Sequence, residues 1–242
     1  MDNDGYWSEI NPNAEYEIII NDVPKNFSKN SNTILKLAKD NNLNAVVISN
    51  DVILTPNWSD RLLNDNVISI PSCNQTHQYG ISESTNIEEF NNRFNMLNTI
   101  AYKHHILNGN VFEKLLMPFY CFKIPYEIID SVGYFDEDFN NGGEDVDYRI
   151  RTIQSGFDVK YCSAFALHFN GKSSWNGVET SQETQNRNEK YISYFREKWG
   201  EDLFNLCVVL GNPMSVIEKY NLFEYIKTSR FNDMIFDVIN RR

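Results

Sequence analysis

Residues 133–157 read GYFDEDFNNGGEDVDYRIRTIQSGF and contain the strongest local pattern in the chain. A helical spacing of apolar residues begins just after the paired glycines Gly142 and Gly143. Gly156 follows the last apolar position, at a place where helices commonly end. The stretch therefore predicts one short helix, whose buried face carries Val146, Ile150 and Ile153.

Strands and helices are predicted to alternate on both sides of this stretch. Residues 45–48 (AVVI) are wholly apolar, which is typical of a strand buried on both faces of a parallel sheet. β-prone runs predict further strands at residues 16–20, 67–70 (ended by Pro71), 119–124 and 158–169. Helical patterns predict helices at residues 30–40, 56–63, 87–100, 127–132 and from 183 to the end. Such alternation predicts an α/β domain with a mixed, mainly parallel sheet flanked by helices.

The composition describes a folded and acidic protein. The chain has 242 residues, 41% hydrophobic and 14% aromatic, enough to build a core. Lys and Arg total 22 against 33 Asp and Glu, so the formal net charge is −11. An acidic surface repels phosphate backbones, so we expect no nucleic-acid partner. One anionic small molecule could still bind through a cation, which reverses the local field.

Membrane and redox signals are absent from the sequence pattern. No apolar run approaches the roughly 18–20 residues that a membrane span needs, and residues 1–5 (MDNDG) do not resemble a signal peptide. The four cysteines are widely spaced and form no C-x-x-C pair: Cys73, Cys121, Cys162 and Cys207. We therefore expect a cytoplasmic protein with no transmembrane segment.

Three positions are candidates for chemistry, each with a simpler structural alternative. Asp51 follows an apolar strand, where a carboxylate can bind a hard cation, although it could equally cap a turn. Glu144 and Asp145 begin the helix of the opening stretch, where the helix dipole keeps a general base ionised but also favours acids for capping alone. His168 ends a predicted strand and suits a metal such as manganese, although a single histidine is usually structural.

Three blocks, in the same order and spacing, resemble the inverting family 2 glycosyltransferases, which have the GT-A fold. The first is residues 133–157, similar to that family's G-x-F-D-E-x-F, G-x-E-D-x-D-x-x-x-R and G-[FY] series. Residues 48–58 (ISNDVILTPNW) resemble its strand-terminal metal block, and residues 168–174 resemble H-x-x-G-x-S. Lys198-Trp199-Gly200 also matches a K-W-G found near its C-terminal end.

The resemblance implies roles for individual residues. Asp51 and His168 would hold a divalent cation, Mn²⁺ or Mg²⁺, and Asp145 would be the catalytic base with Glu144 supporting it or contacting the acceptor. Asn32 and Asn50 would lie near the bound nucleotide. The implied reaction moves a sugar from a nucleotide-sugar donor to a hydroxyl of a glycan or another acceptor, with inversion.

The chain also departs from the family pattern. We find neither of the first two strand motifs, so the fold is expected to be N-terminally shortened, and the metal block has one acid where some relatives have two. Alternatives therefore stay open: a degenerate, non-catalytic nucleotide or carbohydrate binder, or a subunit whose sheet is completed by a partner chain. We expect the GT-A-like domain at residues 1–200, with a loose lead-in at 1–15 and acceptor choice in 72–117, followed by a helical extension at 201–242.

Overall fold

The computed structural model describes residues 21, 25–64, 66–74, 111–139, 141–169 and 180–241. Its strands are β1 (Ala45–Ile48), β2 (Val52–Leu54), β3 (Val67–Cys73), β4 (Cys121–Ile124) and β5 (Asp158–His168). Its helices are α2 (Phe27–Asp40), the 3-10 turn η1 (Ser59–Arg61), α6 (Tyr126–Val132), α7 (Glu144–Gln154), α8 (Ser181–Cys207), α9 (Pro213–Tyr220), α10 (Phe223–Lys227) and α11 (Phe231–Asn240). The strand predicted at 16–20 and the helix predicted at 87–100 lie outside the described residues.

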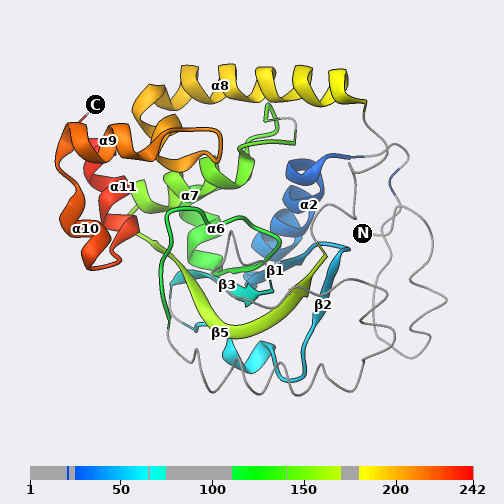
Figure 1. Ribbon diagram of the computed structural model, residues 1–242. Coiled ribbons are helices and arrows are strands. Elements are labelled where there is room, and N and C mark those ends of the chain that lie inside the picture. Colours follow the sequence, from blue (N-terminus) through cyan, green and yellow to red (C-terminus); the bar gives the residue numbers. More distant parts are fainter. Residues whose placement is uncertain are drawn as a thin grey trace.

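The five described strands form one mixed sheet in the order β1-β4-β3-β5-β2. Strands β1, β3 and β5 run in the same direction, whereas β4 and β2 run in the opposite one. The mixed sheet flanked by helices is confirmed (Figure 1). Parallel pairing does not predominate among the described strands, because the reversed β4 lies between β1 and β3 and leaves β3–β5 as the parallel pair.

Two local predictions about strands are wrong. Strand β1 is not buried on both faces: Val46 is 38% and Ile48 is 41% exposed, whereas Ala45 and Val47 on the opposite face are buried. Strand β3 does not end before Pro71 but continues to Cys73. The register shifts between Pro71 and Ser72, so the proline, which lacks an N–H, lies at an irregularity in the strand.

The helices begin and end where local capping chemistry allows. Helix α2 starts at Phe27 rather than at residue 30, because the Asn26 side chain accepts a hydrogen bond from the Lys29 N–H. The helix expected at residues 56–63 is only the turn η1, since Asn57 adopts a left-handed φ of 58° and interrupts helical geometry. Gly156, with φ 83°, follows the last residues of α7 as predicted.

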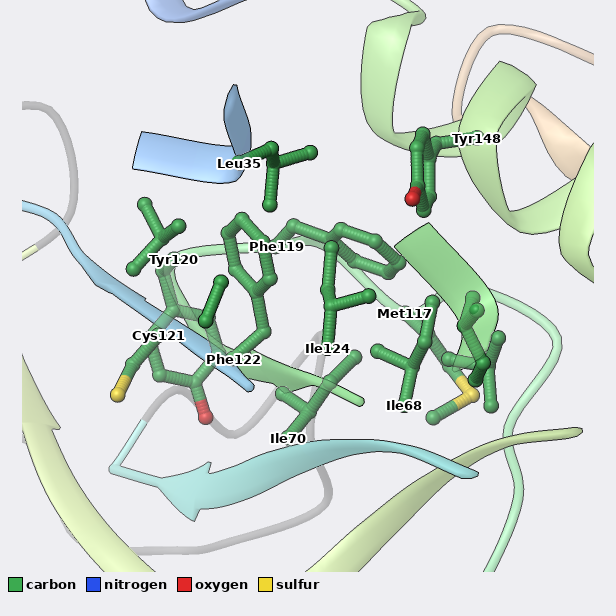
Figure 2. Packing of buried hydrophobic residues seen from close by; sticks show 14 of the residues in the cluster. Leu35, Ile68, Ile70, Met117, Phe119, Tyr120, Cys121, Phe122, Ile124 and Tyr148 are labelled. Carbon is green, nitrogen blue, oxygen red and sulfur yellow. The ribbon is translucent and has the colours of Figure 1, made fainter. Parts of the chain in front are cut away.

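The core that supports the sheet lies beneath helices α2, α6 and α7, which cover one face in Figure 1. Figure 2 shows Phe119 and Ile124 packed between Leu35 and Tyr148 of the helices and the β3 side chains Ile68 and Ile70. A second apolar cluster joins α7 to the C-terminal helices through Ile150, Ile153, Phe195, Leu203 and Ile235. The boundary proposed at residue 200 coincides with a kink in α8, where Gly200 has φ 80°.

Three expectations concern the surroundings of the protein: a membrane span, the state of the cysteines and a partner chain. In the part of the chain that the structure describes, no helix is long and apolar enough to cross a membrane. All four cysteines are buried and reduced. A partner chain that completes the sheet stays a prediction.

Candidate active site

Asp51 and His168, far apart in sequence, lie side by side in the fold. The Asp51 carboxylate Oδ2 is 3.5 Å from the imidazole Nε2 of His168, and both residues are buried. Val52 pairs with His168 across strands β2 and β5, and the Phe169 N–H donates to the Asp51 carbonyl at 2.9 Å. The two side chains are therefore held in place by the sheet itself.

The topology brings these groups to the carboxyl edge of the sheet. The chain passes from β1, at one end of the strand order, to β2, at the other, through residues 49–51 alone. This short crossing runs over the edge where β1, β3 and β5 end, which is where open α/β sheets bind ligands. A site at this edge was the reason that Asp51 was singled out in the sequence.

The Asp51–His168 pair fits a divalent cation as a partial ligand set. Two donor atoms 3.5 Å apart, each about 2.1 Å from one ion, subtend about 110° at it, a normal ligand angle. Among the described residues no group of three or more His, Cys, Asp and Glu could hold a metal. A cation here would therefore need further oxygen ligands from a bound molecule or water, as Mg²⁺ in nucleotide sites commonly does.

Tyr120 fixes the imidazole of His168 from one side. Its ring stacks on His168 with centroids 4.7 Å apart and an interplanar angle of 11°. The tyrosine is itself held, because its hydroxyl donates to the Pro71 carbonyl and its own carbonyl accepts from the Ser49 N–H at 2.9 Å. The sequence indicated a β-prone segment here but gave no sign of this role.

Asp145 lies beside the same segment. Its Oδ2 accepts from the Phe119 N–H at 3.4 Å and its Oδ1 from the Val146 N–H at 2.8 Å. Phe119 thus contacts the proposed base while the next residue, Tyr120, contacts the proposed metal ligand His168. The structure brings all three predicted chemical positions around one pair of adjacent residues.

Burial acts on the pKa of Asp145 in the direction opposite to the helix dipole. The helix dipole was expected to keep this carboxyl ionised, but burial raises the pKa of Asp145 above its ordinary value. The hydrogen bonds from the Val146 and Phe119 backbone oppose this change without cancelling it. A raised pKa makes the conjugate carboxylate a stronger proton acceptor.

Glu144 is a buried acid that precedes Asp145 at the helix start. Burial, and secondly the charge of Asp145, raise the pKa of Glu144 from 4.5 to about 7. Its Oε2 accepts a short hydrogen bond from the Gly142 N–H. The two adjacent carboxyls therefore share one poorly solvated region, in which a single proton can be held near neutral pH.

We predict that Glu144 makes the free energy of unfolding decrease as pH rises. Between pH 4.5 and about 7 the folded protein keeps a proton on Glu144 that the unfolded chain has released. This group therefore costs stability as pH rises through that window, about 3 kcal/mol in all. Urea unfolding at about pH 5 and about pH 8 should show that Glu144→Gln gains about 2–3 kcal/mol on the parent at the higher pH. An equal difference at both pH values would contradict the prediction.

The paired glycines serve packing within the protein. A Cβ on Gly142 would lie 2.5 Å from the Tyr191 ring of α8, and Gly143 has φ 85°. Glycine suits each position for a different reason: Gly142 has no room for a side chain, and Gly143 has a left-handed backbone conformation. Gly142 therefore allows α8 to approach the start of α7 closely through Tyr191.

The two asparagines assigned to the nucleotide have different surroundings. Asn32 is 2% exposed, and its amide bonds the Phe135 N–H, the Phe135 carbonyl and Glu137 Oε1 at 2.7–2.9 Å. These contacts secure α2 to the loop before α7, so Asn32 acts as a structural link in the fold. Asn50 is exposed in the turn before Asp51, and its nucleotide role stays a prediction.

Asn74 is a site residue that sequence reasoning missed. It directly follows β3 at the same sheet edge, and its Oδ1 accepts from the His168 N–H at 2.8 Å. The available signal was its position: a polar residue just past an apolar strand, as with Asp51 after β1. The strand was expected to end earlier, so this position fell within residues 72–117, where acceptor choice was expected.

The other charged residues of the opening stretch and of the K-W-G block form a network of ion pairs and hydrogen bonds that stabilises α7. Asp147 receives bonds from Arg151, Lys198 and Trp199. Lys198 also bonds Asp136, which accepts from Tyr194 at 2.9 Å. The acids and cations of the opening stretch and the K-W-G block thus meet in one network, next to the site but separate from its proposed chemistry.

Comparison with known proteins gives a fold assignment. No protein-family model and no curated protein matches the sequence. A solved structure of GalNAc-T7 with UDP, GalNAc and Mn²⁺ is similar, with a TM-score of 0.51 and 12% identity over 89% of this chain and 46% of that chain. The chain therefore spans about half the length of the structure it matches. Together with the mixed sheet and its flanking helices, this likeness shows that the chain has a GT-A-like glycosyltransferase fold.

Proposed function

We propose that this protein is a metal-dependent glycosyltransferase that uses a nucleoside diphosphate sugar as donor and a glycan or other hydroxyl compound as acceptor. The observation that carries the proposal is the 3.5 Å Asp51–His168 pair at the carboxyl edge of the sheet. Asp145 lies on the same Phe119–Tyr120 segment that contacts His168. The structural likeness to a glycosyltransferase that was crystallised with UDP and Mn²⁺ supports the same class of donor.

In the proposed reaction Asp145 accepts the proton of the acceptor hydroxyl. The oxygen then forms a bond to the anomeric carbon from the face opposite the diphosphate, and the bond from that carbon to the phosphate oxygen breaks. The electron pair leaves with the nucleoside diphosphate, so one displacement inverts the anomeric configuration. Glu144 holds a proton beside Asp145 and lowers the local negative charge.

Asp51 and His168 would hold the Mn²⁺ or Mg²⁺ ion. When bound, such an ion stabilises the negative charge that develops on the departing diphosphate. The protein is acidic overall, with a formal net charge of −11, so a cation is the natural source of this stabilisation. Asp51 and His168 would orient the diphosphate by fixing where its counter-charge lies.

The proposal is tested by metal-dependent release of nucleoside diphosphate from a panel of UDP- and GDP-sugars, with and without EDTA. We expect release that needs the metal and rises when a suitable sugar acceptor is added. NMR of the product should show inversion at the anomeric carbon. Binding of UDP without release from any donor would favour the degenerate, non-catalytic alternative. A protein that does not bind UDP and does not release it from any donor would refute the proposal.

We further predict that Asp51→Ala and His168→Ala each weaken Mn²⁺ binding in the presence of UDP by more than about tenfold, since each removes one protein ligand. Calorimetric titration of Mn²⁺ measures this effect without requiring turnover. Asp40→Ala removes a charge from an exposed position at the end of α2 and should leave the affinity unchanged. Equal losses in Asp51→Ala and Asp40→Ala, with none in His168→Ala, would show that net charge and not ligation decides the affinity.

A further inference from the structure

Asn74 has a fixed side-chain orientation. The backbone N–H of His168 can only donate, so the atom of Asn74 that faces it at 2.8 Å must be the acceptor Oδ1. The amide nitrogen Nδ2 therefore points away from His168 as a donor of two hydrogen bonds. Asn74 is 2% exposed, which leaves the side chain little freedom to turn.

The Nδ2 group of Asn74 is buried and makes no hydrogen bond with any residue that the structure describes. A buried N–H without an acceptor costs free energy, whereas an apolar residue of similar size would avoid that cost. Unsatisfied buried donors in native proteins are uncommon and often point to a missing ligand or ion. This donor lies at the carboxyl edge of the sheet. It belongs to Asn74, whose Oδ1 accepts a hydrogen bond from the backbone of the proposed metal ligand His168.

The surroundings define the kind of acceptor that could satisfy this donor. Asp51 and His168 suit a cation, so a molecule bound beside them would carry negative charge balanced by that cation. Asn74 is hydrogen-bonded to the backbone of His168, so its neutral amide donor suits a second oxygen of the same anionic group. Resting on the function proposed above, we propose that Asn74 binds the donor substrate by donating from Nδ2 to a diphosphate oxygen.

The test compares Asn74→Asp with the parent protein at saturating Mn²⁺. Aspartate keeps an oxygen for the His168 N–H but replaces the donor with a negatively charged acceptor. Calorimetry should show at least tenfold weaker binding of UDP, and a similar loss for inorganic pyrophosphate because the contact is with the diphosphate. Mn²⁺ alone should bind no more weakly than to the parent, which a general loss of structure would not allow.

Two further variants keep the result interpretable. Asn212→Asp makes the same chemical change at an exposed residue before α9 and should bind UDP like the parent. Asn74→Ala removes the donor without adding charge and should also weaken UDP binding, so it replaces Asn74→Asp if that variant does not fold. Parent-like UDP binding by Asn74→Asp overturns this inference and leaves the proposed function standing. A parent protein that binds neither UDP nor pyrophosphate with Mn²⁺ overturns both.

Discussion

Replacing Asp145 with asparagine should lower the rate of sugar transfer by about 10²–10⁴-fold, the usual contribution of a positioned general base. The amide has nearly the same shape as the carboxyl group but cannot accept a proton from the acceptor hydroxyl. One oxygen remains to accept from the Phe119 or Val146 N–H, so the start of α7 should keep its conformation. Initial rates of nucleoside diphosphate release, with UDP affinity measured in parallel, check the result.

The effect on binding separates a catalytic role from a structural one. UDP affinity at saturating Mn²⁺ should be unchanged in Asp145→Asn, because the proposed base contacts the acceptor and not the diphosphate. Glu144→Gln is the matched control, since it makes the same change one residue away and should cost much less activity. A larger loss of the transfer rate in Glu144→Gln than in Asp145→Asn would identify Glu144 as the catalytic base instead.

The pH profile gives an independent check on the same residue. Burial raises the pKa of Asp145, and a base works only when deprotonated, so activity should fall on the acid side at a higher pH than an ordinary aspartate would give. The decrease of kcat at low pH should be measurable in the parent protein. If this decrease is absent in Asp145→Asn, it is assigned to Asp145.

Sequence reasoning succeeded where the signal was local. The bounds of α7 depend on Gly143 before it and Gly156 after it, both left-handed positions that a sequence pattern can reveal. The pairing of Asp51 with His168 was implied by the resemblance to the family motifs, and the structure places the two side chains 3.5 Å apart.

Sequence reasoning failed where long-range pairing decides the outcome. Nothing near residues 121–124 indicates that this strand inserts between β1 and β3 in the opposite direction. The hydrogen bonds of Asn32 with Phe135, 103 residues later, were likewise not predictable from local sequence, and its nucleotide role stays a prediction. The raised pKa of Asp145 depends on burial by distant segments, which charge patterns along the chain do not report.

The largest loss of stability is expected from Asp147→Asn, at about 3–5 kcal/mol. Asp147 has no exposed surface, and its carboxylate bonds Arg151 Nε at 2.9 Å, Lys198 Nζ at 2.8 Å and Trp199 Nε1 at 2.8 Å. Asparagine keeps one acceptor oxygen but places an NH₂ group against donors, removes the ion pair of Arg151 and leaves Lys198 with Asp136 as its counter-charge. Placing an amide donor against buried donors and breaking these bonds at a fully buried side chain costs far more than the loss of an exposed ion pair.

Denaturant unfolding of Asp147→Asn checks this value, with Glu224→Gln as the matched control. Glu224 pairs with Lys227 at 3.0 Å on an exposed helix, so its replacement should cost less than about 1 kcal/mol. Asp147 lies on the helix that carries Asp145, so a destabilised but folded variant should also lose activity through displacement of the base. Parent-like stability would mean that the Asp147 network does not hold α7. The proposed site would then depend on the Phe119–Tyr120 segment alone.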